Sequence, residues 1–264
     1  TMPNGDIKPL DLGRLKTLVK EACSDLSHVD SAPILKDALR NLYHQAHLND
    51  VHKALIMAAR SLVEKEPNYT FVSARLLLNS LRTEALSQLG MQQETTCDEM
   101  AGLYQAYFKK YLTHGINQGI IDSTLAEFDL EKLGKALLPK RDMQFTYLGL
   151  QTLYDRYFIH ENNTRYELPQ SFFMRVAMGL ALREPANRDD KAIEFYLQLS
   201  SFDYMSSTPT LFNAGTVRPQ LSSCYLTTVP DHLDGIYGAI RDNALLSKFA
   251  GGLGNDWTPV RAMG

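Results

Sequence analysis

Apolar positions in the first ninety residues recur every three or four residues, the spacing of one face of an α-helix. Short polar segments interrupt this pattern and place helix starts at Asp11, Ser31 and Asn49. The break at residues 66–68 precedes a fourth helix, from about residue 70 to residue 89. The pattern therefore predicts a compact unit of four helices.

A hairpin signal precedes these helices. Asn4-Gly5 is a strong signal for a two-residue turn, and residues 7–10 would form the second strand. Little chain precedes the turn in this sequence, and Pro9 interrupts the second strand. We expect the hairpin to be incomplete or degenerate.

The next hundred or so residues again have a helical pattern. Asn162-Asn163 joins two short β-like runs, which predicts a small hairpin. The segments with apolar residues at helical spacing lie near 98–115, 123–138, 142–157, 170–184 and 189–203.

The pattern changes after residue 205, where proline, glycine, serine and threonine become frequent. Residues 206–211 and 221–226 alternate apolar and small polar positions, which predicts strands. A helix is expected at about 235–249. This order is typical of the start of an α/β barrel. A barrel needs many more strands to close, so we expect a part of a larger subunit.

Composition narrows the class of protein. The 264 residues are 44% hydrophobic, enough for a core in one or two domains, and a net charge of −3 gives no general attraction to nucleic acid or membranes. No apolar run approaches the about 18 residues of a membrane span. The three cysteines, Cys23, Cys97 and Cys224, are odd in number and far apart, which indicates a reducing compartment. We expect a cytoplasmic protein that binds neither nucleic acid nor membranes.

Cys224 is the strongest candidate for a chemically active residue in this sequence. It falls within the predicted strand at 221–226, and a strand holds a redox thiol rigidly. Free cysteine is also among the most often buried residue types, so a small buried hydrophobe is the alternative from this residue alone.

Two other groups of residues have plain structural explanations. A helix C-cap and turn would explain the glycine run at 251–254. His44, His47 and His52 form no metal pattern, because no cysteine or clustered carboxylate joins them. We expect these histidines to be exposed and no metal to be bound.

Several short motifs near the C-terminal end are more informative as a set than singly. They are Thr208-Pro209-Thr210-Leu211, Ser222-Ser223-Cys224, Asp231-His232-Leu233-Asp234, Gly251-Gly252-Leu253-Gly254 and Arg261. They resemble the start of the catalytic barrel of class I ribonucleotide reductase large subunits. Residues 141–147 and 168–177 resemble the helical N-terminal domain of the same subunits, and the hairpin signal with its four helices resembles an ATP-cone.

The resemblance implies a mainly α N-terminal region followed by the first β-α-β elements of a ten-stranded α/β barrel. The expected domains are an ATP-cone-like domain over 1–91, a helical domain over 92–204 and the start of the barrel over 205–264.

The resemblance also assigns roles in substrate chemistry. In this family a cysteine pair reduces the ribose, and Cys224 matches the strand-borne member, which protonates the departing 2′-hydroxyl and then forms a disulfide with a distant cysteine. Thr208 would meet the substrate diphosphate, and Ser223 would lie beside the nucleotide. Gly251 and Gly252 would bring bare backbone against the base.

A second set of residues matches the specificity site of the family, which binds a deoxynucleoside triphosphate effector: Asp231, His232, Leu233 and Arg261. The carboxylate would hold the effector's 3′-hydroxyl, and the arginine would pair with its phosphates. A helix N-cap at Asp231 and a surface ion pair at Arg261 are the alternatives.

The ATP-cone resemblance is the loosest. In the family the first strand and the turn supply basic residues to the nucleotide phosphates, but Met2 and Pro3 stand there in this sequence. Lys8 and Arg14 are the remaining nearby cations. The missing cations favour a helical packing unit without a ligand over a nucleotide site.

The function implied is reduction of ribonucleoside diphosphates to 2′-deoxyribonucleoside diphosphates by thiyl-radical chemistry, with ATP, dATP and deoxynucleoside triphosphates as effectors. No cofactor is expected on this chain, because the family's di-metal radical cofactor belongs to the small subunit. The implied partners are that small subunit, thioredoxin or glutaredoxin, and further large subunits, with the helix at 235–249 as a candidate interface. An adenosylcobalamin-dependent reductase and a non-catalytic regulatory or assembly module are the alternatives, and we expect the chain alone to be inactive.

Overall fold

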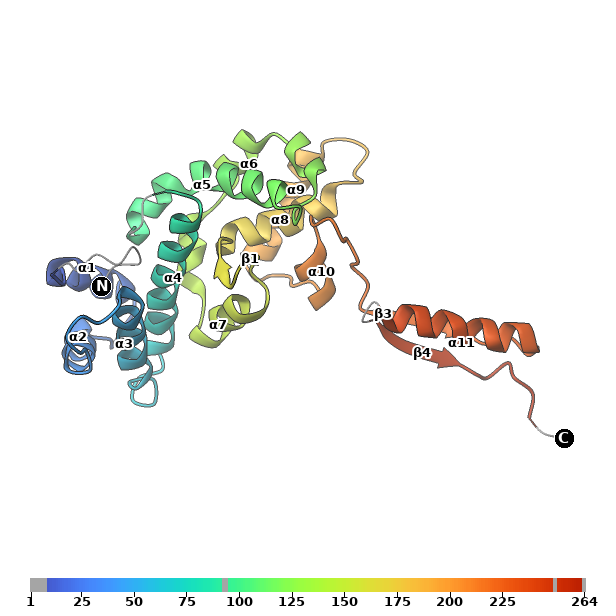
Figure 1. Cartoon of the computed structure of the whole chain (residues 1–264), viewed down its shortest axis with the longest axis horizontal. Coiled ribbons are helices and arrows are strands. Elements are labelled where there is room, and N and C mark those ends of the chain that lie inside the picture. Colours follow the sequence, from blue (N-terminus) through green and yellow to red (C-terminus); the bar gives the residue numbers. More distant parts are fainter. Residues whose placement is uncertain (1–8, 92–94, 249–250, 263–264) are drawn as a thin grey trace.

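The computed structural model describes residues 9–91, 95–248 and 251–262, and over these ranges the chain is mostly helical (Figure 1). The predicted fold class, a mainly α region followed by the first elements of an α/β barrel, is confirmed. In chain order the helices of the N-terminal part are α1 (Leu12–Ala22), α2 (Ser31–Arg40), α3 (Leu48–Arg60) and α4 (Tyr69–Gln88).

Local sequence signals set the starts of these helices. The side chains of Asp11 and Asp30 accept hydrogen bonds from the backbone of the first turns of α1 and α2. The predicted start of α3 at Asn49 is wrong, because the helix begins at Leu48. Asp50 stabilises that start by accepting from the backbone N–H of His47, so Asn49 lies inside the first turn.

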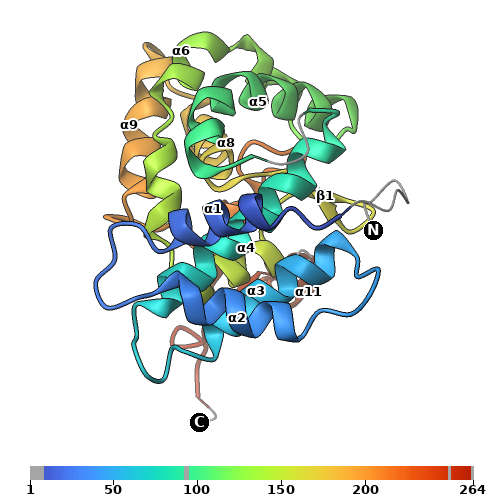
Figure 2. The ribbon, with the colours of Figure 1, turned by 90° about the vertical axis from the view of Figure 1, so that its left-hand side faces the viewer.

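Helix α4 is the centre of this region. Helices α1 and α3 pack on it from one side, and α7 (Tyr147–Arg156) packs on it from another. Figure 2 shows α1, α2 and α3 in front of α4. Because neighbours surround it, α4 is buried along nearly its whole length. The buried apolar cluster continues from α1 through α4 to the helices that follow.

The middle of the chain contains more breaks than its apolar pattern suggests. The segment predicted near 123–138 is divided at Phe128, whose extended backbone ends one helix before Asp129 caps the next. The hairpin at Asn162-Asn163 is confirmed, since both asparagines adopt positive φ (48° and 66°) between its two strands. The elements are α5 (Cys97–Asn117), η1 (Ser123–Glu127), α6 (Leu130–Ala136), η2 (Pro139–Gln144), β1 (His160–Glu161), β2 (Thr164–Arg165), α8 (Pro169–Ala181) and α9 (Arg188–Ser200).

The strand predicted at 206–211 is wrong, because these residues form the short helix α10 (Thr208–Asn213). Pro209 lies in the first turn of that helix, where its missing N–H costs nothing, and Ser207 is the N-cap. The alternation of apolar and polar residues alone therefore predicted the wrong secondary structure for this segment.

The β-helix-β order predicted after this point is confirmed. Strand β3 (Cys224–Thr228) pairs in parallel with β4 (Gly252–Asp256), and α11 (Leu233–Lys248) connects them. Figure 1 shows this unit extending away from the helical body, at the end of a segment that follows α10.

Candidate functional site

Thr208 lies in the helical body at the start of α10, with its side chain exposed. Its Oγ1 is 3.1 Å from the hydroxyl of Tyr157, which directly follows α7. Two side chains of α10 bind the chain that leads to β3. Thr210 donates to the carbonyl of Leu221 at 3.1 Å, and Asn213 donates to the carbonyl of Gln220 at 2.8 Å. The helix that carries Thr208 is thus joined to the segment just before Cys224.

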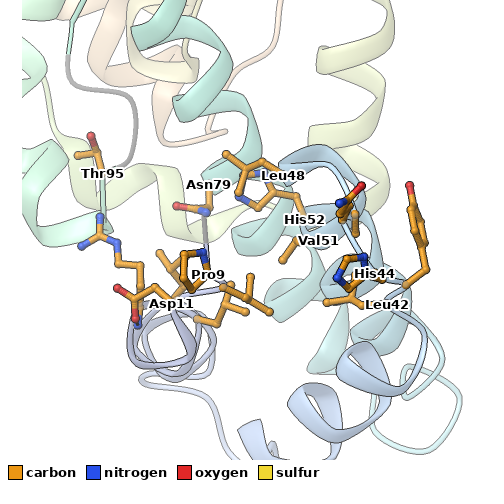
Figure 3. A pocket seen from close by; sticks show the side chains of 16 residues that line it. Pro9, Asp11, Leu42, His44, Leu48, Val51, His52, Asn79 and Thr95 are labelled. Carbon is orange, nitrogen blue, oxygen red and sulfur yellow. Dashed lines mark hydrogen bonds between the residues drawn. The ribbon is translucent and has the colours of Figure 1, made fainter. Parts of the chain in front are cut away.

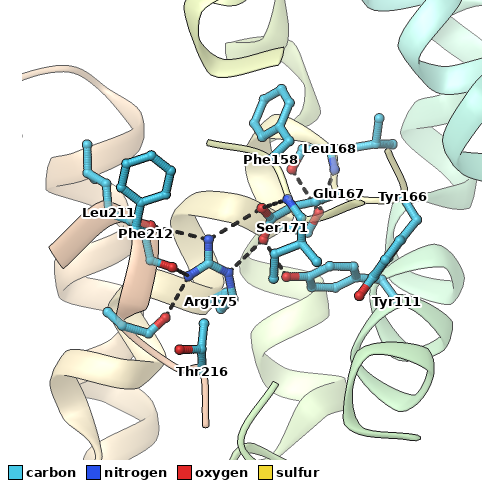
Figure 4. Close-up of polar contacts among 12 residues, drawn as sticks. Tyr111, Phe158, Tyr166, Glu167, Leu168, Ser171, Arg175, Leu211, Phe212 and Thr216 are labelled. Atoms are coloured by element: carbon cyan, nitrogen blue, oxygen red, sulfur yellow. Dashed lines mark hydrogen bonds and ion pairs between the residues drawn. The ribbon is translucent and has the colours of Figure 1, made fainter. Parts of the chain in front are cut away.

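A buried ion pair between Arg175 and Glu167 holds α10 in place. Arg175 of α8 and Glu167 are both fully buried, and Nε of Arg175 lies 2.7 Å from Oε1 of Glu167. The same guanidinium donates to the carbonyl oxygens of Leu211 at 3.3 Å and Ala214 at 2.6 Å. Figure 4 shows Arg175 between Glu167 and these carbonyl groups. The guanidinium therefore links α8 to the end of α10.

The electrostatics of this pair keep the Arg175 guanidinium charged. Burial alone would lower the pKa of Arg175, but the adjacent Glu167 carboxylate outweighs burial and raises it. Tyr111 donates to Glu167 at 2.5 Å, and burial followed by the nearby carboxylate raises the pKa of that phenol well above its usual range. The sequence marked residues 168–177 as a helical-domain segment, but nothing in the spacing indicated that Arg175 binds α10.

Cys224 is the first residue of β3, and its side chain is exposed. The buried alternative for this cysteine is therefore wrong. Its register partner is Gly252 of β4, whose N–H donates to the carbonyl of Ser223 at 2.9 Å. A Cβ added to Gly252 would lie 3.5 Å from the Cys224 sulfur, so these residues form one surface. The structure thus places Cys224, Ser223 and Gly252 side by side.

The glycine run belongs to a strand and not to a C-cap turn. Gly252 and Gly254 lie within β4, and Gly251 directly precedes it. A Cβ at Gly251 would fall 2.6 Å from Cδ2 of the Tyr225 ring, and Gln220 holds that ring by donating to its hydroxyl. Bare backbone at this position is therefore needed to seat Tyr225 of the neighbouring strand.

The four residues of the predicted specificity site lie around the start of α11. Nε of Arg261 binds Oδ2 of Asp231 at 2.7 Å, so the surface ion pair foreseen for Arg261 is present. The N-cap alternative for Asp231 is wrong, because Nδ1 of His232 accepts from the backbone N–H of Gly235 instead. Leu233 is 73% exposed. Asp231 and Arg261 thus meet each other, whereas the leucine faces solvent.

A cavity of about 570 Å³ opens between α1, α3 and the loop that joins α2 to α3 (Figure 3). Arg14 lines it and binds the carboxylate of Glu99 at 3.0 Å, while Lys8 lies outside the described residues. Two buried polar atoms of its lining, Nδ1 of His52 and Oγ1 of Thr95, have no hydrogen-bond partner among the residues that the structure describes.

The environment of His52 differs from the expectation of exposed histidines. His44 and His47 are exposed as predicted, but the His52 side chain is buried, and burial lowers its pKa to about 4. The imidazole is therefore neutral at pH 7. Helix α3 turns this position inward, which the isolated spacing of histidines did not reveal.

The parts of the chain that the structure describes contain no group of three or more histidine, cysteine or acidic residues arranged to hold a metal ion. Within the same residues, no helix combines the length and apolar character needed to cross a membrane.

Comparisons with known proteins agree with the geometry. Residues 143–219 match the all-alpha domain of ribonucleotide reductase, and residues 222–264 match its barrel domain. The chain is 46% identical over 252 residues to the ribonucleoside-diphosphate reductase subunit alpha of Chlamydia muridarum, covering 95% of this chain and 24% of that protein.

Two further relatives carry the same kind of name. The chain is 37% identical to the subunit alpha of Helicobacter pylori strain 26695, covering 99% of this chain and 32% of that protein. It is 28% identical to the large subunit of Monkeypox virus, covering 99% of this chain and 33% of that protein. The chain thus spans about a quarter to a third of the length of these relatives.

Fold and site together define a mainly helical domain that leads into the first parallel strands of an α/β barrel, the first of which begins at Cys224. The chain belongs to the ribonucleotide reductase large-subunit family.

Proposed function

We propose that the protein containing this chain is a class I ribonucleoside-diphosphate reductase and that Cys224 is one of its redox cysteines. The exposed thiol at the start of β3, beside Ser223 and the bare backbone of Gly252, is the observation that carries the proposal. An exposed thiol can reach both a nucleotide and an exchange partner, which a buried one cannot.

Each residue of the site has a defined task in this reaction. Cys224 gives its proton to the departing 2′-hydroxyl, which leaves as water. Its sulfur then bonds to a second cysteine of the full subunit, so that two thiols become one disulfide while the ribose is reduced to deoxyribose. Thr208 and Ser223 supply hydroxyl groups to the nucleotide, and Gly251 and Gly252 lie against its base.

Other parts of the enzyme complete the cycle. We propose that a partner small subunit supplies the radical through its di-metal cofactor and that thioredoxin or glutaredoxin returns the disulfide to thiols. An adenosylcobalamin-dependent enzyme is the alternative, and a small-subunit gene beside the gene of this protein favours the class I assignment.

A chimera tests the proposed role of Cys224. The chain replaces the matching segment of the Helicobacter pylori subunit alpha, with which it shares 37% identity. We expect the chimera to reduce CDP with the matching small subunit, and Cys224→Ser to abolish turnover because no disulfide can form. Cys23→Ser is the matched control, since Cys23 lies at the end of α1, and it should retain activity. A Cys224→Ser chimera with undiminished turnover would exclude the redox role.

For the effector we propose a half-site at the start of α11. Asp231 and Arg261 are already 2.7 Å apart, and the phosphates of a deoxynucleoside triphosphate would compete with Asp231 for the guanidinium. Tyr237 and Ile240 of α11 are exposed apolar side chains, which supports this helix as a contact between large subunits. We therefore expect weak effector binding to the separate chain.

The cavity beside Arg14 supports a second function, the binding of a regulatory nucleotide. A neutral His52 and the Thr95 hydroxyl offer unsatisfied polar atoms within it, which a nucleoside could satisfy. The carboxylate of Glu99 occupies Arg14 and opposes the approach of phosphates.

Calorimetry with ATP and dATP measures this directly. We expect weak binding to the wild-type chain and about tenfold tighter binding to Glu99→Gln, because the variant removes a negative charge that competes with phosphate for Arg14, and a tenfold change corresponds to about 1.4 kcal/mol. Glutamine keeps the acceptor that caps Thr96 at the start of α5, so the helix should persist. Glu131→Gln, on the exposed face of α6, is the charge-matched control. Equal affinities for all three proteins would reject the nucleotide site.

An assembly role without catalysis is the remaining alternative. Light scattering with and without ATP or dATP tests it, and a monomer unchanged in every condition would count against it.

A further inference from the structure

The hydroxyl of Thr208 has one hydrogen-bond partner among the residues that the structure describes, the phenol of Tyr157. The two oxygens are 3.1 Å apart, although the residues are separated by 51 positions in the chain. Tyr157 directly follows α7, and its backbone N–H donates to the carbonyl of Leu153 at 2.9 Å. The phenol therefore extends from the end of one helix to the start of another.

Aromatic contacts on two sides fix the Tyr157 ring. It stacks on Phe212 of α10, with centroids 4.5 Å apart and planes 11° from parallel. It also meets the ring of Phe172 of α8 edge to face, at 6.4 Å and 78°. A change of χ1 at Tyr157 would break both contacts, so these contacts hold the phenol oxygen in a defined position.

We propose that Tyr157 is a positioning residue that orients the Thr208 hydroxyl toward a phosphate oxygen of the substrate. The inference rests on the proposed contact between Thr208 and the diphosphate. A hydroxyl group donates once and accepts twice. When the Tyr157 phenol donates to Oγ1 of Thr208, the threonine's own proton is directed to another acceptor.

The buried pair beneath α10 supports this arrangement. Arg175 binds the carbonyl oxygens of Leu211 and Ala214, which lie before and after Phe212 in the chain, and the Phe212 ring stacks on Tyr157. The helical domain therefore fixes both the hydroxyl-bearing helix and the phenol that orients its hydroxyl. Neither partner belongs to the barrel strands.

The test compares the wild-type chain with Tyr157→Phe, which keeps the ring and removes only the hydroxyl. Nuclear magnetic resonance coupling constants report the χ1 rotamer of Thr208, and titration with CDP and with inorganic pyrophosphate follows its methyl signal. We expect a single rotamer in the wild-type chain, averaging over rotamers in the variant, and affinity for both ligands about three- to tenfold weaker. Tyr147→Phe is the matched control, because the Tyr147 hydroxyl donates to Gln151 within α7 and not to Thr208.

The outcomes separate this inference from the function on which it rests. Equal Thr208 rotamers and equal affinities in wild type and Tyr157→Phe would overturn the positioning role. A released rotamer in the variant, with no binding of either ligand to the wild-type chain, would support the orientation by Tyr157 and refute the diphosphate contact of Thr208. Circular dichroism verifies that Tyr157→Phe keeps its helical content, so that neither result reflects unfolding.

Discussion

Replacing Arg175 by methionine is expected to destabilise the chain by about 3–5 kcal/mol, the usual cost of breaking a buried ion pair. Arg175 and Glu167 are both fully buried, so the variant would leave a carboxylate without its cation. It would also remove the donors to the carbonyl oxygens of Leu211 and Ala214. Urea denaturation followed by circular dichroism measures the change.

The double variant Glu167→Gln, Arg175→Met is the matched control. It removes both charges, and replacing a whole buried pair is far less costly than removing one partner. Tyr111 can still donate to the glutamine carbonyl in place of the carboxylate. We expect the double variant to recover a large part of the lost stability. A single variant that loses less than about 1 kcal/mol would contradict the assigned role of this pair.

The second large effect concerns the free energy of unfolding between about pH 4 and pH 6. Two buried groups, His52 and Asp142, make it depend on pH in opposite directions. Burial lowers the pKa of His52 to about 4, below its value in the unfolded chain. The unfolded chain therefore binds more protons in this window, and the His52 contribution to stability is lost as the pH falls. At about 1.4 kcal/mol for each pKa unit, the loss is about 3 kcal/mol.

Asp142 acts in the opposite direction. Burial raises its pKa to about 6, against the lowering effects of Arg82 and of hydrogen bonds from Gln170 and Tyr104. The native chain therefore holds the extra proton, and stability increases as the pH falls from about 6 to 4. The increase is also about 3 kcal/mol.

These two contributions nearly cancel in the wild-type chain and separate in variants. His52→Phe should become more stable relative to wild type as the pH falls from 6 to 4, whereas Asp142→Asn should become less stable. Urea denaturation at several pH values gives both differences, and subtracting the wild-type curve removes the titration of surface carboxylates. Parallel curves for all three proteins would show that neither buried group titrates as described.

The helices of the chain were predictable because their causes are local. Apolar spacing, the side-chain cap at Asp11 and the helix start at Ser31 act within one or two turns, and the structure follows them. The turn at Asn162-Asn163 is equally local, since asparagine tolerates the positive φ that it requires. The error at α10 arose where local cues conflicted, because the alternating pattern favours a strand and Pro209 favours a helix start.

The sequence indicated which residues belong to the candidate site, but it indicated few of the contacts that these residues make. The motif around Cys224 indicated a thiol on a strand, and its exposed position beside Gly252 agrees with that reading. The same motifs gave no sign that His232 would cap α11 in place of Asp231. Both residues can cap a helix, and the geometry of the preceding turn selects between them.

The sequence by itself determined most of the helices, the β-helix-β order that follows them and the place of Cys224 on a strand. These follow from spacing, caps and residue chemistry over short distances. Only the tertiary structure decided that Tyr157 meets Thr208, that Arg175 binds α10 and that His52 is buried and neutral. Such contacts join residues that packing brings together from distant parts of the chain, so no local pattern encodes them.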